Sequence, residues 1–79
     1  MSRPVKRSFT IAGHRTSISL EASFWEALKT LAAEEHLPVA QLIARIDQGR
    51  EGGGLSSAVR VWILNKYRYG AAKKIERTA

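Results

Sequence analysis

Three side chains that can hydrogen-bond nucleic-acid bases recur at every second residue near the start of the chain: Arg15, Ser17 and Ser19. Ile18 and Leu20 alternate with them, which predicts a strand with one polar face and one apolar face. Small polar side chains beside an Arg suit a β-ribbon in the major groove of DNA, because they reach base edges without clashing. We therefore predict that Arg15, Ser17 and Ser19 read DNA bases.

The segment before this strand leaves two arrangements open. Residues 8–11 alternate polar and apolar side chains, as a half-buried strand does. Residues 12–14 interrupt this alternation, and Gly13 is the kind of residue that turns or bulges a strand. The chain forms either one long bulged strand or a hairpin whose second arm is Arg15–Leu20. The pattern favours two strands.

Three helices are expected after the strands. The first spans residues 22–35, with Ser23 and Glu26 at the spacing of a capping box. Trp25 widens its apolar face, which suits the core of a dimer. A two-residue break at residues 36–37 precedes the second helix, residues 38–48. The third spans residues 58–69 and is apolar almost all round, so it must be buried on more than one side.

Smaller signals mark the helix ends. His36 occupies the position where the chain leaves the first helix, a place usually given to Gly or Asn. Pro38 suits the first position of the second helix, because its missing N–H would be unbonded there in any case. Ser56 or Ser57 can cap the third helix.

Chain length indicates how the fold is completed. A single core in a chain of 79 residues is marginally stable, and the absence of Cys excludes disulfides. A lone strand also leaves backbone groups that a second copy can pair. The fold class predicted is α+β, an intertwined homodimer or a tetramer built from it, with an antiparallel ribbon across the dimer axis. Residues 1–7 form a flexible basic arm, 8–69 the domain and 70–79 a basic tail.

Charge is segregated along the chain, whose formal net charge is +6. Residues 1–20 hold four bases and no acid, residues 21–51 six acids and three bases, and residues 52–79 six bases and one acid. Basic ends around an acidic middle suit a polyanion partner, and double-stranded DNA is the partner predicted. Lys6 and Arg7, just before the strand, are placed to contact phosphates.

Other function classes find little support. The chain has no Cys, no paired carboxylates in an apolar setting and no nucleophile–base spacing, so an enzyme is not expected. Two His without Cys argue against a structural zinc site, and no cofactor is expected. No apolar run approaches the roughly 20 residues of a membrane span, and the start lacks the apolar core of a signal peptide. We expect a soluble cytoplasmic protein.

The stretch from Arg15 to Ile46 resembles the ribbon-helix-helix proteins, the superfamily of the Arc and MetJ repressors. The resemblance is carried by residues 15–20, the apolar positions of the first helix, the turn at residues 36–37 and the sequence Pro-Val-Ala-Gln-Leu-Ile from Pro38. The whole chain looks like a small bacterial branch of that superfamily.

This resemblance implies that Arg15, Ser17 and Ser19 read bases, and that the backbone N–H groups of Val39 and Ala40 hold a phosphate. The chain departs from the family at the turn before Pro38, which lacks the usual Gly and capping hydroxyl, and by adding a third helix. An alternative alignment starts the family's second helix at Gly54–Ala58. The phosphate site then moves to two serines, Ser56 and Ser57.

The function predicted is a sequence-specific DNA-binding transcriptional regulator that acts as a homodimer or higher oligomer. The alternative is a protein-interaction module on the same fold, similar to an antitoxin that grips its toxin, with weak or no DNA binding. Glu21 adds a negative charge near the expected DNA face, so the outer strand residues alone do not decide between the two functions.

Overall fold

The sheet of this protein is a hairpin built within one chain. The computed structural model describes the backbone of residues 3–78 and the side chains of residues 3–69. Strand β1 spans Val5–Ile11 and strand β2 spans His14–Leu20. They pair antiparallel, with Val5 opposite Leu20 and Ile11 opposite His14. The favoured two-strand arrangement is confirmed. β2 is therefore not a lone strand, because β1 pairs with it, and the intertwined dimer stays a prediction.

The two strands are joined by a tight turn at Ala12 and Gly13. Both residues have positive φ angles, 52° and 81°. Two consecutive positive φ values are the geometry of a type I′ turn, whose twist matches that of the flanking strands. Gly13 adopts this conformation without steric cost, whereas in Ala12 the Cβ makes it sterically unfavourable. The interruption in the sequence pattern is therefore a two-residue hairpin turn.

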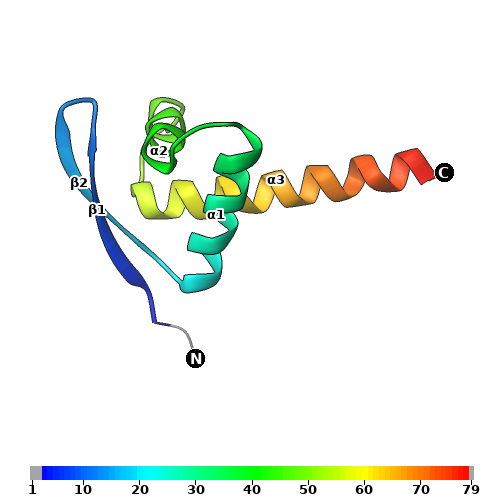
Figure 1. Cartoon of the computed structure of the whole chain (residues 1–79), viewed down its shortest axis with the longest axis horizontal. Helices are drawn as coiled ribbons and strands as arrows, with labels where there is room; N and C mark the ends of the chain where they lie inside the picture. The colour runs from blue at the N-terminus through cyan, green and yellow to red at the C-terminus, as the bar shows by residue number, and fades with distance from the viewer. Residues whose placement is uncertain (1–2, 79) are drawn as a thin grey trace.

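Three helices pack on the same side of the hairpin (Figure 1). Helix α1 spans Ala22–Glu34, α2 spans Val39–Gln48 and α3 spans Leu55–Thr78. The first two agree closely with the prediction. The third is longer than the predicted 58–69, and its backbone stays helical where a tail was expected. No helix within residues 3–78 is long and apolar enough to cross a membrane.

The first strand begins at Val5, inside the predicted arm of residues 1–7, and Lys6 and Arg7 lie in β1. Met1 and Ser2 are outside the described residues, as are the side chains of the basic residues after Tyr69. Residues 5–7 lie in a strand and the backbone of residues 70–78 is helical. In other respects, the division of the chain into arm, domain and tail stays a prediction.

The ends of the first helix differ in part from the prediction. The N-cap of α1 is Glu21, which makes no side-chain capping bond. Its carbonyl oxygen accepts the N–H groups of Phe24 and Trp25 at 2.9 and 3.1 Å. Ser23 thus lies inside the first turn, so the predicted capping box is wrong. His36 has a φ of 57°, which confirms a left-handed residue where the chain leaves α1.

The core draws on the hairpin and all three helices. Its buried side chains are Ile11, Ile18, Leu20, Trp25, Leu28, Leu31, Ala32, Leu42, Ile43, Ile46, Val59 and Ile63. Trp25 was expected in a dimer core, but it is buried within its own chain. Its ring lies 5.9 Å from that of Phe9, and its indole N–H donates to the carbonyl of Val5 at 2.9 Å.

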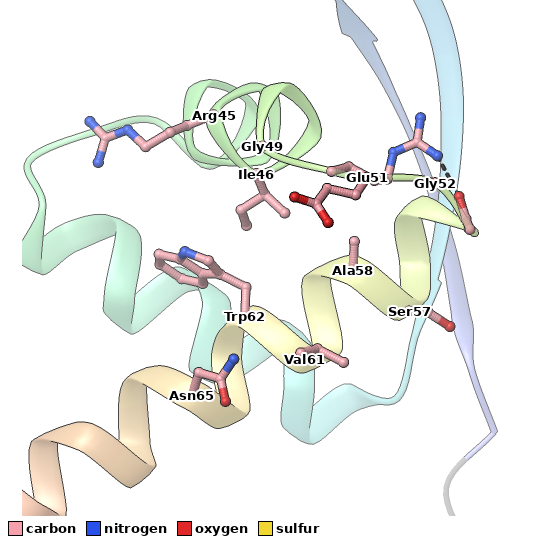
Figure 2. Close-up of a pocket in the computed structure, with 13 residues that line it drawn as sticks. Arg45, Ile46, Gly49, Glu51, Gly52, Ser57, Ala58, Val61, Trp62 and Asn65 are labelled. Atoms are coloured by element: carbon pink, nitrogen blue, oxygen red, sulfur yellow. Dashed lines mark hydrogen bonds between the residues drawn. The ribbon is translucent and has the colours of Figure 1, made fainter.

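A hollow of about 540 Å³ lies where α2 meets α3 (Figure 2). Ile46, Ala58 and Trp62 surround it with apolar side chains. The two arginines on its rim are already engaged. Arg45 pairs with Glu35 at 2.8 Å and Arg50 with Asp47 at 2.9 Å. The first pair links the end of α1 to α2, and the second links the loop after α2 to the end of that helix.

The hairpin turn provides a stability test with two opposite outcomes. Ala12→Asn should stabilise the protein, because Asn tolerates positive φ and Asn-Gly is the preferred type I′ pair. Gly13→Ala should destabilise it by about 1 kcal/mol, which corresponds to a fall in Tm of roughly 4–8 °C in a domain of this size. Thermal unfolding by circular dichroism measures both. A long bulged strand in solution would not give this pair of opposite shifts.

Candidate nucleic-acid interface

The strand register assigns each side chain of the hairpin to one of two faces. Residues directly opposite each other in an antiparallel pair point to the same face. Arg7 is paired with Ile18 and Phe9 with Thr16. Because Ile18 is fully buried, this set faces the helices. The other set faces away from them.

We call this second set the outer face, and it consists of Lys6, Ser8, Thr10, Arg15, Ser17 and Ser19. All except the half-buried Ser19 are exposed. The hydroxyl oxygens of Ser8 and Ser17 lie 3.3 Å apart across the two strands. The outer face carries two bases and no acid. Every side chain on it can donate a hydrogen bond, so its chemistry suits acceptor groups.

Arg15, Ser17 and Ser19 thus share one face, as the alternation of the sequence predicts. Lys6 joins them, although it was assigned to a flexible arm. Arg7 does not, because it lies on the helix side of the sheet. Its guanidinium carbon is 5.4 Å from the ring centroid of Trp25, the distance of a cation–π contact. The strand geometry separates two bases that are neighbours in sequence.

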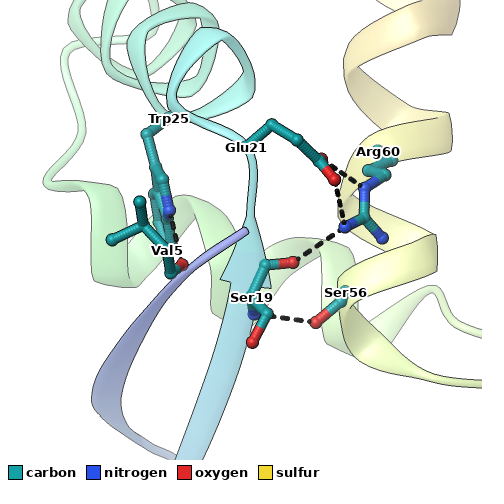
Figure 3. A network of polar contacts seen from close by, with 6 residues as sticks. All are labelled: Val5, Ser19, Glu21, Trp25, Ser56 and Arg60. Atoms are coloured by element: carbon teal, nitrogen blue, oxygen red, sulfur yellow. Dashed lines mark hydrogen bonds and ion pairs between the residues drawn. The ribbon is translucent and has the colours of Figure 1, made fainter. Parts of the chain in front are cut away.

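The exposed edge of β2 is closed by α3 (Figure 3). The N–H of Ser19 donates to the Oγ of Ser56 at 3.0 Å, and its carbonyl oxygen accepts a guanidinium N–H of Arg60 at 3.1 Å. Both backbone groups of Ser19 therefore point away from β1. Two side chains of α3 take the place that a third strand would otherwise occupy.

Arg60 also joins α3 to the start of α1. It donates to both carboxylate oxygens of Glu21, at 3.0 and 3.3 Å. Its guanidinium lies 6.0 Å from the ring centroid of Phe24. The hydrogen bonds from Arg60 hold the pKa of the Glu21 carboxyl below its ordinary value. The negative charge of Glu21, next to the outer face, is therefore paired with a base.

A second hollow, of about 600 Å³, borders the outer face where β2 approaches the start of α3. Arg15 and Ser17 line it from β2, and Ser56 and Ser57 from α3. Val39 and Ala40 lie half-buried at the start of α2 and do not line this hollow. Of the two helix starts considered for a phosphate, the one in α3 is next to Arg15.

Ser8 and Thr10 were missed as members of this surface. The signal was in the sequence, since Phe9 and Ile11 are apolar and their neighbours must point the other way. It could be used only once a hairpin was chosen over a bulged strand, because a bulge shifts the alternation and exchanges the two faces.

The model of the ribbon-helix-helix domain family matches residues 4–67 of this chain. The match covers most of the sequence, and the two strands and the helices that follow agree with it. The chain therefore belongs to the ribbon-helix-helix domain family. No curated protein and no solved structure matches it. The match reaches into α3, so the third helix is part of the shared domain and not an addition to it.

The Glu21–Arg60 pair predicts a pH-dependent stability. Because the pKa of Glu21 is lowered in the folded state, its contribution is complete above the pKa of the unfolded chain, about 4.3. The contribution disappears as the pH falls through the lower folded value. Wild-type protein should therefore lose more stability between neutral and acidic pH than Glu21→Gln does.

Urea unfolding over a pH series measures this difference. Glu51→Gln is the matched control, since it removes an exposed carboxylate in the loop before α3. The control should follow the wild-type curve. Equal curves for all three proteins would show that the Glu21–Arg60 pair does not stabilise the fold.

Proposed function

We propose that this protein is a sequence-specific DNA-binding transcriptional regulator that reads the major groove with its hairpin. The observation that carries the proposal is the outer face, a two-stranded surface of six hydrogen-bonding side chains with two bases and no acid. Membership of the ribbon-helix-helix family supports it, because strands are the groove-reading elements of that superfamily.

The width of a two-stranded hairpin is compatible with insertion into the major groove of DNA. Neighbouring strands lie about 4.8 Å apart, and the major groove is about 12 Å wide, so a two-stranded ribbon fits. The inner face of the hairpin is fixed to the helices through Ile11, Ile18 and Leu20. The strand backbone that carries the outer side chains is thus held by a packed core and loses little freedom on binding.

Individual roles follow from side-chain chemistry. Arg15 is the outer-face residue that can make a bidentate contact to a guanine edge. Ser17 and Ser19 supply single hydrogen bonds, and Lys6 contacts phosphate as a point charge. A phosphate beside Arg15 meets the exposed start of α3 at Ser57, where helix N–H groups favour an anion. Arg7, Val39 and Ala40 remain candidates for phosphates further from the outer face.

The test compares two substitutions of bases on the outer face with one elsewhere. DNA duplexes are first selected from a random pool with the wild-type chain, and binding is then measured by fluorescence anisotropy. Arg15→Ala should weaken binding to the selected duplex by roughly tenfold or more, since a bidentate Arg–guanine pair contributes about 1–3 kcal/mol of discrimination. Binding to unrelated duplex should fall much less.

Lys6→Ala should instead weaken binding to all sequences alike. It should also flatten the dependence of log K on log salt by about 0.9 for each phosphate that the variant no longer neutralises. Arg45→Ala is the control, because it removes an exposed base on α2, away from the hairpin. If Arg15→Ala weakens selected and unrelated DNA equally, Arg15 binds the phosphate backbone and does not read bases. If the wild-type chain enriches no sequence, the protein-interaction alternative replaces this proposal.

A further inference from the structure

The outer face of the hairpin is built from three rows of paired side chains. The register gives the rows as Lys6 with Ser19, Ser8 with Ser17, and Thr10 with Arg15. Both backbone groups of Ser19 point away from β1, so these are the antiparallel pairs that exchange no backbone hydrogen bonds. Such pairs have Cα atoms only about 4.5 Å apart, and their side chains lie close together. The 3.3 Å between the Oγ atoms of Ser8 and Ser17 agrees with this.

The row next to the turn combines two different chemical groups. Arg15 carries a guanidinium, and Thr10, opposite it on β1, carries a hydroxyl and a methyl group. Both side chains are exposed. Thr10 is the one outer-face residue with a methyl group, since the other five side chains end in hydroxyl, ammonium or guanidinium groups. Its branched Cβ restricts the side-chain torsion χ1, so β1 presents this methyl group in a narrow range of positions.

The spacing of the rows matches the spacing of base pairs in DNA. Neighbouring rows are two residues apart, which is about 6.8 Å along an antiparallel strand. Base pairs rise about 3.4 Å each, so one row covers about two base pairs and the outer face about five. Arg15 and Thr10 share a row, so they reach the same base pair or adjacent ones. A guanine contacted by Arg15 leaves a neighbouring base pair within reach of Thr10.

We infer that Thr10 determines specificity by contacting the C5-methyl group of a thymine next to the guanine that Arg15 reads. Thymine is the base that displays a methyl group in the major groove, and the methyl of Thr is among the apolar groups that recognise it. The DNA that fits the turn end of the hairpin thus has a G·C pair adjacent to an A·T pair. This contact rests on the proposed function, because it forms only if the hairpin enters the major groove.

The contact is tested with DNA that lacks a single methyl group. The duplex is one selected from a random pool by the wild-type chain, and the guanine read by Arg15 is the position at which Arg15→Ala loses its base preference. Each thymine within about two base pairs of that guanine, the span of one row, is then replaced by deoxyuridine, one at a time. Fluorescence anisotropy measures binding. One replacement should weaken wild-type binding by about fourfold, the factor that corresponds to burial of one methyl group.

Substitutions at Thr10 separate the methyl group from the hydroxyl. Thr10→Ser removes the methyl group and should bind the thymine duplex about fourfold more weakly than wild type does. It should bind the thymine and deoxyuridine duplexes equally. Thr10→Val keeps a methyl group and loses the hydroxyl, so it should still distinguish the two duplexes. Position 10 is exposed, so both variants should fold, which circular dichroism checks.

Thr16→Ser is the matched control. It makes the same chemical change on the other strand, but Thr16 is paired with Phe9 and belongs to the set that faces the helices. This variant should distinguish thymine from deoxyuridine as wild type does. An equal loss in Thr10→Ser and Thr16→Ser would show that the effect comes from the hairpin as a whole, and the assignment to Thr10 would be wrong.

The other outcomes separate this contact from the proposed function. A wild-type chain that enriches no sequence overturns the proposed function, and the Thr10 contact with it. A selected duplex without thymine beside the guanine, or one that binds equally well with deoxyuridine at every such position, overturns the Thr10 contact alone. If Thr10→Ser still distinguishes the two duplexes, another side chain contacts the methyl group and the assignment is wrong.

Discussion

The arrangement of this domain depends on how the end of β2 is bonded on both sides, to β1 and to α3 at Ser19. β1 pairs along one edge, and the side chains of Ser56 and Arg60 bond to Ser19 on the other. At Ser19 these side chains take the place of a neighbouring strand. The same hydrogen bonds fix where α3 begins, and Arg60 links it to α1 through Glu21. Hairpin, α1 and α3 are thus held by one small cluster.

The sequence predicted where helices and strands lie better than it predicted which segments pair with each other. The apolar spacing of α1 and α2 is a local property, and both helices lie where it places them. The pairing of β2 is not local, because a strand pattern does not say whether the partner comes from the same chain. A Gly beside Ala gave a weaker turn signal than Asn-Gly would have given. The intertwined dimer was predicted because the partner of β2 was not known from the sequence, and it stays a prediction.

The candidate site also combines features that a local sequence pattern encodes with features that it does not. Alternation alone placed Arg15, Ser17 and Ser19 on one face, since the period of a strand is fixed by its geometry. The face of the sheet on which Arg7 lies could not be predicted until the register of β1 was known. The hydrogen bonds of Ser56 and Arg60 with Ser19 join residues about 40 positions apart, and no local pattern encodes them. Helix packing brings these residues together.

A hairpin made by one chain also removes a symmetry constraint. In a ribbon formed by two identical chains, each substitution appears twice, and the DNA under the ribbon has to be a palindrome to match both strands. Here Lys6, Ser8 and Thr10 form one strand of the outer face and a different trio forms the other. Each strand can change in sequence without changing its neighbour. Under the proposed function, the stretch of DNA that fits one hairpin is free to be asymmetric, and an inverted repeat in a longer target would reflect the association of two domains.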